Sequence, residues 1–229
     1  MYKQFLTARS PLRLLEKGLH GGLGRGNLGL VVAGRGVGKT PVLVGFALDE
    51  LLREGRVLHI SFDQSVAHVR DYYNTVFSDL AHSVHLEDAA RIHADIDRQR
   101  GIRAYPGMPF STGKLREAVK LEGETCAQPT LLVIEGIQMN GDLREELADL
   151  KALAQELSAE VWLSAANSGE HVGGIPSDVA PVKDFLSVIL ALEPASDCVR
   201  LRALKDHENP DVTSLHVALD PRTLLLTRN

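Results

Sequence analysis

The stretch AGRGVGKT, residues 33–40, follows the apolar run LGLVV and precedes the helix-like run PVLVGFALDELLREG. It meets the pattern G-x-x-x-x-G-K-[ST], except that Ala33 takes the first position. Glycines let backbone N–H groups turn toward the β- and γ-phosphates of a nucleotide, Lys39 supplies positive charge, and the Thr40 hydroxyl is placed to bind magnesium. The sequence therefore predicts a phosphate-binding loop with contacts from Gly34, Gly36, Val37, Gly38, Lys39, Thr40 and Pro41.

The glycines of this loop are also compatible with two other kinds of loop. A dinucleotide-binding loop, G-x-G-x-x-G counted from Gly34, would require glycine where Lys39 stands, so that interpretation is set aside. A glycine-rich turn between a strand and a helix that carries Lys39 by accident stays as the alternative.

Apolar and amphipathic runs alternate along the chain at the spacing that βα units require. Buried strands are expected at 28–33, 56–62, 130–136, 160–166 and 185–192. Helices are expected at about 38–54 and 65–77 and after the third of these strands. The carboxyl-terminal residues alternate polar and apolar side chains, with turn signals at 209–210 and 220–221. We therefore predict a doubly wound α/β fold with a mostly parallel sheet and antiparallel strands at its carboxyl-terminal edge.

Length and composition indicate one globular domain over residues 1–229, with 78–129 as a variable excursion. The net charge of −5 argues against a strongly basic nucleic-acid-binding face. Cys126 and Cys198 lack metal-type spacing, which favours a reducing compartment. No uninterrupted apolar run has membrane-spanning length, so we expect a cytoplasmic protein with no membrane partner.

Five segments, in this order, resemble a single RecA-type domain of the KaiC-like branch of P-loop ATPases. They are GLHGGLGRGNLGLVVAGRGVGKT, GRVLHISFDQS, LLVIEG, DFLSVILAL and RLRALKDH. The phosphate loop is shared by many folds, so the specific part of the likeness lies in SFDQS and LKDH at their proper distances. The resemblance implies a three-layer RecA-like P-loop NTPase core, assembled as a ring or filament with ATP held between neighbouring subunits.

The same resemblance implies a catalytic role for Lys39 and for the two residues at the tip of the second strand. KaiC-like proteins usually carry two adjacent glutamates there to orient and activate water, whereas this chain has Asp63 and Gln64. Asp63 is one methylene shorter, and Gln64 can align a water but cannot accept its proton. We therefore expect slow hydrolysis. The alternative is that Asp63 only caps the following helix.

Further site residues follow from the Walker B strand and the closing strands. Glu135 replaces the aspartate that is usual at this position. Together with Thr40 it is expected to bind the metal ion Mg2+. Lys205 and His207 match the family's Lys-x-Arg, which reaches the γ-phosphate bound by a neighbouring subunit. The alternative for these two is an exposed turn with incidental charge. Asn167 lies where related folds sense the γ-phosphate, although asparagine is also common in loops.

Two other polar clusters have a simpler interpretation. The spacing of His82, His85 and His93 matches no metal motif, which favours a structural or surface role. Three arginines, Arg98, Arg100 and Arg103, lie near Tyr105 in the sequence. They could bind a polyanion, but a solvent-exposed charged face is the favoured interpretation.

The functional hypothesis is an ATP-binding protein that slowly hydrolyses ATP with Mg2+, its nucleotide state controlling self-assembly or docking to a protein partner. A regulatory module that holds ATP without turnover is the first alternative. A DNA-acting recombinase or helicase-like motor is the second, although the acidic composition does not favour nucleic acid. A small-molecule kinase lacks an evident arginine-rich lid. The sequence leaves the choice between ATP and GTP open.

Overall fold

The computed structural model describes residues 7–8, 10–125, 127–139, 143–166, 174–209, 212 and 214–229. Cys126, Asn167 and Pro210 therefore lie outside the described residues. None of the helices in these ranges combines the length and the apolar composition that crossing a bilayer requires.

The described chain forms one nine-stranded sheet in the order β3-β2-β4-β5-β1-β6-β7-β8-β9. Neighbouring strands from β3 to β6 in this order run parallel. The last three pairings are antiparallel. The strand bounds are β1 Leu28–Ala33, β2 Val57–Ser61, β3 Arg100–Ala104, β4 Leu131–Ile137, β5 Glu160–Ala166, β6 Val188–Pro194, β7 Val199–Asp206, β8 Ser214–Leu219 and β9 Leu226–Arg228. The predicted α/β class, the mostly parallel sheet and the antiparallel carboxyl-terminal strands are confirmed.

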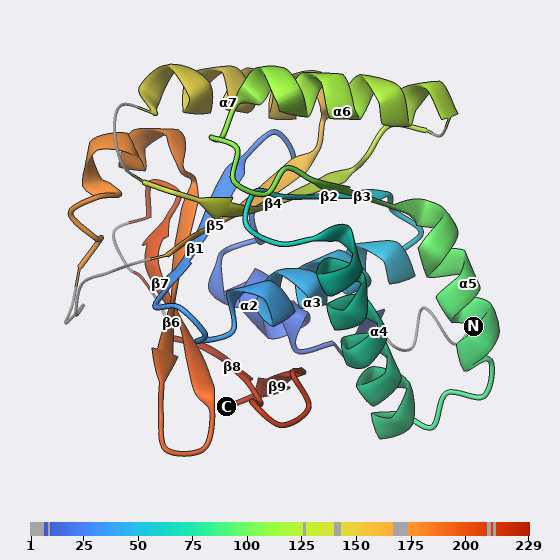
Figure 1. Ribbon diagram of the computed structural model, residues 1–229. Helices are drawn as coiled ribbons and strands as arrows, with labels where there is room; N and C mark the ends of the chain where they lie inside the picture. Colours follow the sequence, from blue (N-terminus) through green and yellow to red (C-terminus); the bar gives the residue numbers. More distant parts are fainter. Residues whose placement is uncertain are drawn as a thin grey trace.

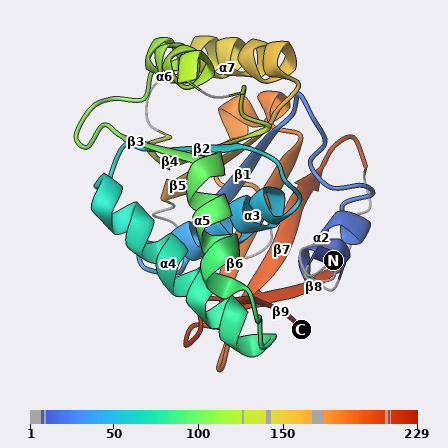
Figure 2. The same ribbon diagram turned by 90° about the vertical axis from the view of Figure 1, so that its right-hand side faces the viewer.

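Helices cover both faces of the sheet. Figure 1 shows α6 and α7 above the sheet and α3 and α4 below it, and the view in Figure 2 agrees. A short 3-10 helix, η1, precedes β6. The bounds are α2 Leu12–Gly18, α3 Lys39–Leu52, α4 Val66–Ser83, α5 Ala89–Gln99, α6 Thr112–Thr125, α7 Arg144–Leu157 and η1 Ala180–Phe185. The arrangement is that of a three-layer α/β fold.

Alternating side chains of the strands build the two cores between these layers. On β4, Leu131 and Val133 pack with α3 and α4, whereas Leu132 and Ile134 pack with α6 and α7. Every residue of β1 is buried, as expected for a parallel strand covered on both faces. Successive side chains of a strand point to opposite faces of the sheet. Polar residues that share a face with Leu131 and Val133 therefore face α3.

The local sequence explains where the first two long helices begin. Pro41 lies in the first turn of α3, where its missing N–H removes no intrahelical hydrogen bond. Ser65 caps α4 by accepting a hydrogen bond from the backbone N–H of His68, at 3.2 Å. α4 continues to Ser83, beyond the predicted end near Phe77, because its buried face extends to Ala81.

The stretch 78–129 contributes part of the sheet as well as helices. Within it, β3 pairs in parallel with β2, from Val57 opposite Arg100 to Ser61 opposite Ala104. The sequence did not predict this strand, because it is short and only Gly101 in it is fully buried. As an edge strand it lacks the continuous apolar run that marks β1 and β4.

Candidate functional site

The phosphate-binding loop lies where β1 ends and α3 begins. Gly38 takes the N-cap position of α3 in the left-handed region, with φ of +113°, and no side chain caps the helix. The positive φ favours glycine, and a Cβ at this position would lie 2.5 Å from Cδ2 of Leu219, so that side chain would have to shift. Gly38 thus offers no side-chain acceptor to the backbone N–H groups of the first turn, and an N-terminus of this kind is suited to binding an anion.

Lys39 lies across this loop. Its Nζ donates hydrogen bonds to the carbonyl oxygens of Ala33, at 3.1 Å, and Gly34, at 2.9 Å. Burial lowers the pKa of Lys39, while the negative charges of Asp63 and Glu135 act in the opposite direction. The ammonium group thus lies near both carboxylates and is held by two weak acceptors that a phosphate can replace.

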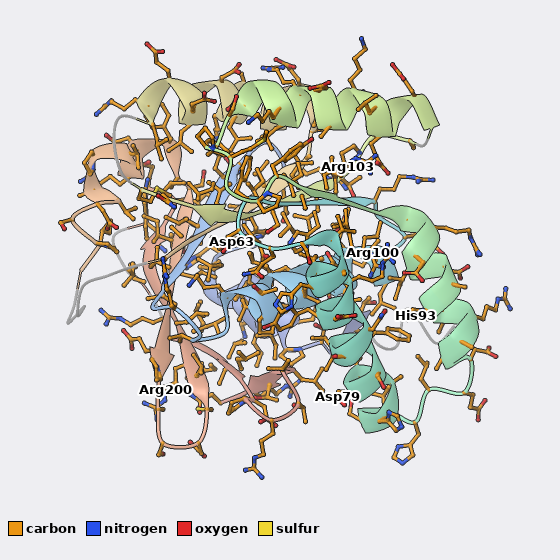
Figure 3. The ribbon with its side chains drawn as sticks, in the orientation of Figure 1. Asp63, Asp79, His93, Arg100, Arg103 and Arg200 are labelled. Carbon is orange, nitrogen blue, oxygen red and sulfur yellow. The ribbon has the colours of Figure 1, made fainter. Side chains whose placement is uncertain are left out.

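Asp63 follows β2 at the same edge of the sheet, as can be followed in Figure 3. The buried Ser61 hydroxyl donates to Oδ1 of Asp63, at 3.1 Å, and accepts from the backbone N–H of Gln64, at 2.9 Å. One hydroxyl therefore fixes both residues of the turn. The Asp63 carboxylate is exposed, and the helix cap is Ser65, so the interpretation of Asp63 as the cap of α4 is wrong.

Gly136 brings the end of β4 against Asp63. It has φ of +78°, and a Cβ there would lie 2.6 Å from Cγ and 2.7 Å from Oδ1 of Asp63. Ser61 stands opposite Glu135 in the parallel pairing of β2 with β4. Register and close packing together hold the carboxylates of Asp63 and Glu135 at one edge of the sheet.

Glu135 is a buried carboxylate with unused hydrogen-bonding capacity. The residue is 1 % exposed, and neither Oε1 nor Oε2 accepts a hydrogen bond from any described residue. A buried carboxylate without hydrogen bonds is unfavourable unless positive charge lies near it, so these oxygens suit a cation. The described residues contain no group of three or more metal-binding side chains. Mg2+ nevertheless fits this donor set, because it commonly takes one or two carboxylates together with substrate phosphates and waters.

His59 is the buried neighbour of Glu135, and it was not among the site residues predicted from the sequence. Its Nε2 lies 3.4 Å from Oε2 of Glu135, and its Nδ1 lies 3.1 Å from the Tyr73 hydroxyl. Burial raises the pKa of Tyr73, so its hydroxyl keeps its proton. The signal for this residue was a histidine inside an apolar strand, on the same strand face as Ser61.

Lys205 and His207 lie at the opposite edge of the sheet. Asp206 stands opposite Val188, which stands opposite Gly29 near the amino end of β1. Nζ of Lys205 donates to the carbonyl oxygens of Lys183, at 3.0 Å, and Leu186, at 2.6 Å. The structure therefore does not bring Lys205 and His207 to the phosphate loop of their own chain.

A buried aspartate organises this opposite edge. The Asp206 carboxylate lies 2.7 Å from Nδ1 of His20 and 2.9 Å from Nδ1 of His207, and Nε2 of His207 lies 3.1 Å from the Leu23 carbonyl oxygen. Burial acts to raise the pKa of Asp206, but hydrogen bonds from His207, His20 and Asn209 hold it below its usual value. The cluster joins the glycine-rich segment before β1 to the end of β7.

The clusters judged to be structural have partners within the chain. His82 Nδ1 lies 2.8 Å from the Ser78 carbonyl oxygen, and His93 Nε2 lies 3.0 Å from Oδ1 of Asn74. The three arginines each contact a carboxylate: Arg98 with Asp95, Arg100 with Asp97 and Arg103 with Glu122. His93, Arg100 and Arg103 are labelled in Figure 3. These pairings do not favour a polyanion site.

A cavity of about 660 Å³ lies elsewhere, along α3, α4, β9 and the start of α2. Most of the side chains around it are apolar, including Leu48, Leu52, Val76, Leu80 and Leu226. No residue of the phosphate loop lines it. It is therefore separate from the site formed by Lys39, Asp63 and Glu135.

Comparison of the chain with protein-family models gives no match, and comparison with curated proteins gives none either. Any function proposed for the chain therefore rests on the geometry of the residues around the phosphate loop.

The close packing of Gly136 on Asp63 can be tested by Gly136→Ala. We expect the free energy of unfolding to fall by about 1–3 kcal/mol more than in Gly107→Ala, because overpacking is added to a similar backbone strain. Gly107 is a matched control, since its φ is +77° and nothing lies within 4 Å of an added Cβ. Urea denaturation measures both changes. Equal losses in the two variants, or an undiminished loss in an Asp63→Gly background, would contradict the described contact.

The Asp206 cluster predicts a specific dependence of stability on pH. Asp206→Asn is expected to lower the free energy of unfolding by about 1–3 kcal/mol, because hydrogen bonds to a buried charged group are lost. Since the pKa of Asp206 is lowered by folding, its contribution is fully present above the ordinary aspartate pKa of about 3.9 and is lost as pH falls further. Urea denaturation from pH 6 to pH 2.5 measures the difference, with exposed Asp71→Asn as the control. A difference that persists undiminished at pH 2.5 would refute this account.

Proposed function

We propose that the protein is an ATP-binding P-loop protein with a KaiC/RecA-like core, and that slow Mg-dependent hydrolysis of ATP controls its assembly or its docking to a partner. One observation carries the proposal: Lys39 lies at a helix N-terminus without a side-chain cap, close to the carboxylates of Asp63 and Glu135. A cation and free N–H groups suit phosphates, and the nearby carboxylates suit a metal ion and a water.

The fold supports the RecA-like part of the proposal. Parallel strands with helices on both faces are followed by antiparallel strands, which is the architecture that the resemblance implies. The phosphate loop follows β1, Asp63 follows β2, and Glu135 lies near the carboxyl end of β4, so the three come from different parallel strands. Ligands of open α/β sheets bind at the carboxyl ends of such strands.

Thr40 and Glu135 are the residues that would hold Mg2+. The Thr40 hydroxyl belongs to the first turn of α3, and the Glu135 oxygens have no hydrogen-bond donor among the described residues. When bound, the ion would neutralise charge on the phosphate oxygens. Lys39 contributes a further positive charge to the same oxygens and would leave the carbonyls of Ala33 and Gly34 to do so.

Asp63 is the residue proposed to orient and deprotonate the attacking water. It is exposed, and the Ser61 hydroxyl and the Gly136 backbone fix its position. Aspartate is about 1 Å shorter than the glutamate usual at this position, and such a displacement lowers rates by about a hundredfold. Gln64 can align the water without accepting its proton. Slow turnover follows from this pair of residues.

The phosphate-binding role of Lys39 is tested by Lys39→Ala. Loss of a charge-assisted hydrogen bond of about 1.5–3 kcal/mol predicts a 10- to 100-fold weaker affinity for ATP. Titration calorimetry measures the affinity, and light scattering with ATP, GTP or no nucleotide measures assembly in the same samples. Lys120→Ala, an exposed lysine of α6 on the other face of the sheet, is the control. Unchanged ATP affinity in Lys39→Ala would remove the central claim.

A regulatory module that binds ATP without turnover is the second candidate, and Gln64 in place of a second carboxylate favours it. Asp63→Asn separates the two candidates. For an ATPase we expect turnover to fall by about 100-fold or more with ATP affinity little changed, since a general base contributes about 10²–10⁴ to the rate. Steady-state phosphate release measures turnover, with exposed Asp71 of α4 as the site of a matched Asp→Asn control. Turnover that does not respond to Asp63→Asn would leave the regulatory module as the better description.

A further inference from the structure

The side chains of His59 and Glu135 meet across neighbouring parallel strands. His59 stands opposite Val133 in the pairing of β2 with β4, and Ser61 stands opposite Glu135. Glu135 is therefore the diagonal neighbour of His59 on the same face, a separation that long side chains bridge. Both residues are buried, at 0 % and 1 % exposure.

The facing atoms of this pair have hydrogen-bonding capacity that no described residue uses. His59 Nε2 and both Glu135 carboxylate oxygens are buried without a hydrogen-bond partner. The distance of 3.4 Å from Nε2 to Oε2 is longer than an ordinary hydrogen bond, and a small rotation of either side chain would close it. Neither group has another described donor or acceptor to satisfy it, so each is the natural partner of the other.

Tyr73 fixes the far side of the His59 ring. Its hydroxyl lies 3.1 Å from Nδ1, and the two rings are in edge contact, with centroids 5.6 Å apart. The Tyr73 ring is fully buried and carries the Arg100 guanidinium 4.3 Å above its centroid. Because the Tyr73 hydroxyl keeps its proton, it can donate to Nδ1, and the proton of a neutral imidazole then resides on Nε2, facing Glu135.

We infer that His59 is a positioning residue that donates its Nε2–H to one oxygen of Glu135 and directs the other oxygen toward a divalent cation at the phosphate loop. This inference rests on the proposed function, because it assumes that the loop binds a nucleotide with its metal ion. Hydrogen bonds to a ligating carboxylate orient it, and removing such a partner typically weakens metal binding by about 10- to 100-fold. The chain Tyr73–His59–Glu135 then extends the metal site from the sheet edge to α4.

Two substitutions of His59 separate positioning from packing. In His59→Gln the amide nitrogen can take the place of Nε2 and still donate to Glu135. In His59→Asn the amide nitrogen reaches only the place of Nδ1, next to Tyr73. The readout is the affinity for Mn2+ in the presence of a non-hydrolysable ATP analogue, measured by electron paramagnetic resonance. Affinity for the metal-free analogue is measured in parallel by calorimetry.

The positioning role predicts about a tenfold weaker Mn2+ affinity in His59→Asn and a change of no more than about threefold in His59→Gln. Affinity for the metal-free analogue stays the same in all three proteins. Tyr73→Phe, which removes only the hydroxyl that orients His59, provides a second variant should His59→Asn fail to fold, and it is expected to weaken Mn2+ binding as well.

The outcomes distinguish this inference from the proposed function. Wild-type protein that binds the analogue and Mn2+, with unchanged Mn2+ affinity in His59→Asn and Tyr73→Phe, overturns the positioning role and leaves the function standing. Equal losses in His59→Gln and His59→Asn overturn it too, because they indicate damage to packing. Wild-type protein that binds neither the analogue nor Mn2+ overturns both.

Discussion

The parallel pairing of β2 with β4, with Ser61 opposite Glu135, is the constraint on which the candidate site depends. It sets His59, Ser61 and Glu135 on the face that α3 covers, next to the loop that carries Lys39. A slip of one residue would turn Glu135 into the apolar core beneath α6 and α7. Apolar neighbours on both faces, such as Val133 and Ile134, hold the register and thereby place these polar groups.

The α3 face of these strands departs from an otherwise apolar core. At the amino ends of β2 and β4 this face carries the apolar side chains of Val57 and Leu131. Toward the carboxyl edge it carries the polar side chains of His59, Ser61 and Glu135, and all five residues are buried. Ser61 is satisfied by hydrogen bonds, whereas His59 and Glu135 keep unused capacity. Polar groups left incompletely satisfied at the end of well-packed strands are typical of sites where ligand binding completes the structure.

The sequence predicted most of the fold because its strong signals are local. The run before Gly34 marks β1, and the pattern through Lys39 defines the strand, the loop and the start of α3. β3 was missed because an edge strand with one fully buried residue has no distinctive periodicity. His59 was missed because its significance depends on β4 and α4, and contacts between distant segments have no signature in a single stretch of sequence.

The placement of Lys205 and His207 follows from strand direction. Since β7 runs antiparallel to β6, its end lies at the amino edge of the parallel strands, while the phosphate loop lies at their carboxyl edge. A nucleotide bound between subunits would then require head-to-tail contact, in which the amino edge of one copy meets the carboxyl edge of the next. Such heterologous contacts generate rings when the rotation closes and filaments when it does not.

Lys205 donates to two backbone carbonyl oxygens. If its side chain extended to the phosphate of a neighbouring subunit, these weak acceptors would be replaced by a stronger, charged one. The Asp206 cluster, by contrast, would keep His207 in place, so Lys205 is the better suited of the two to extend across the junction.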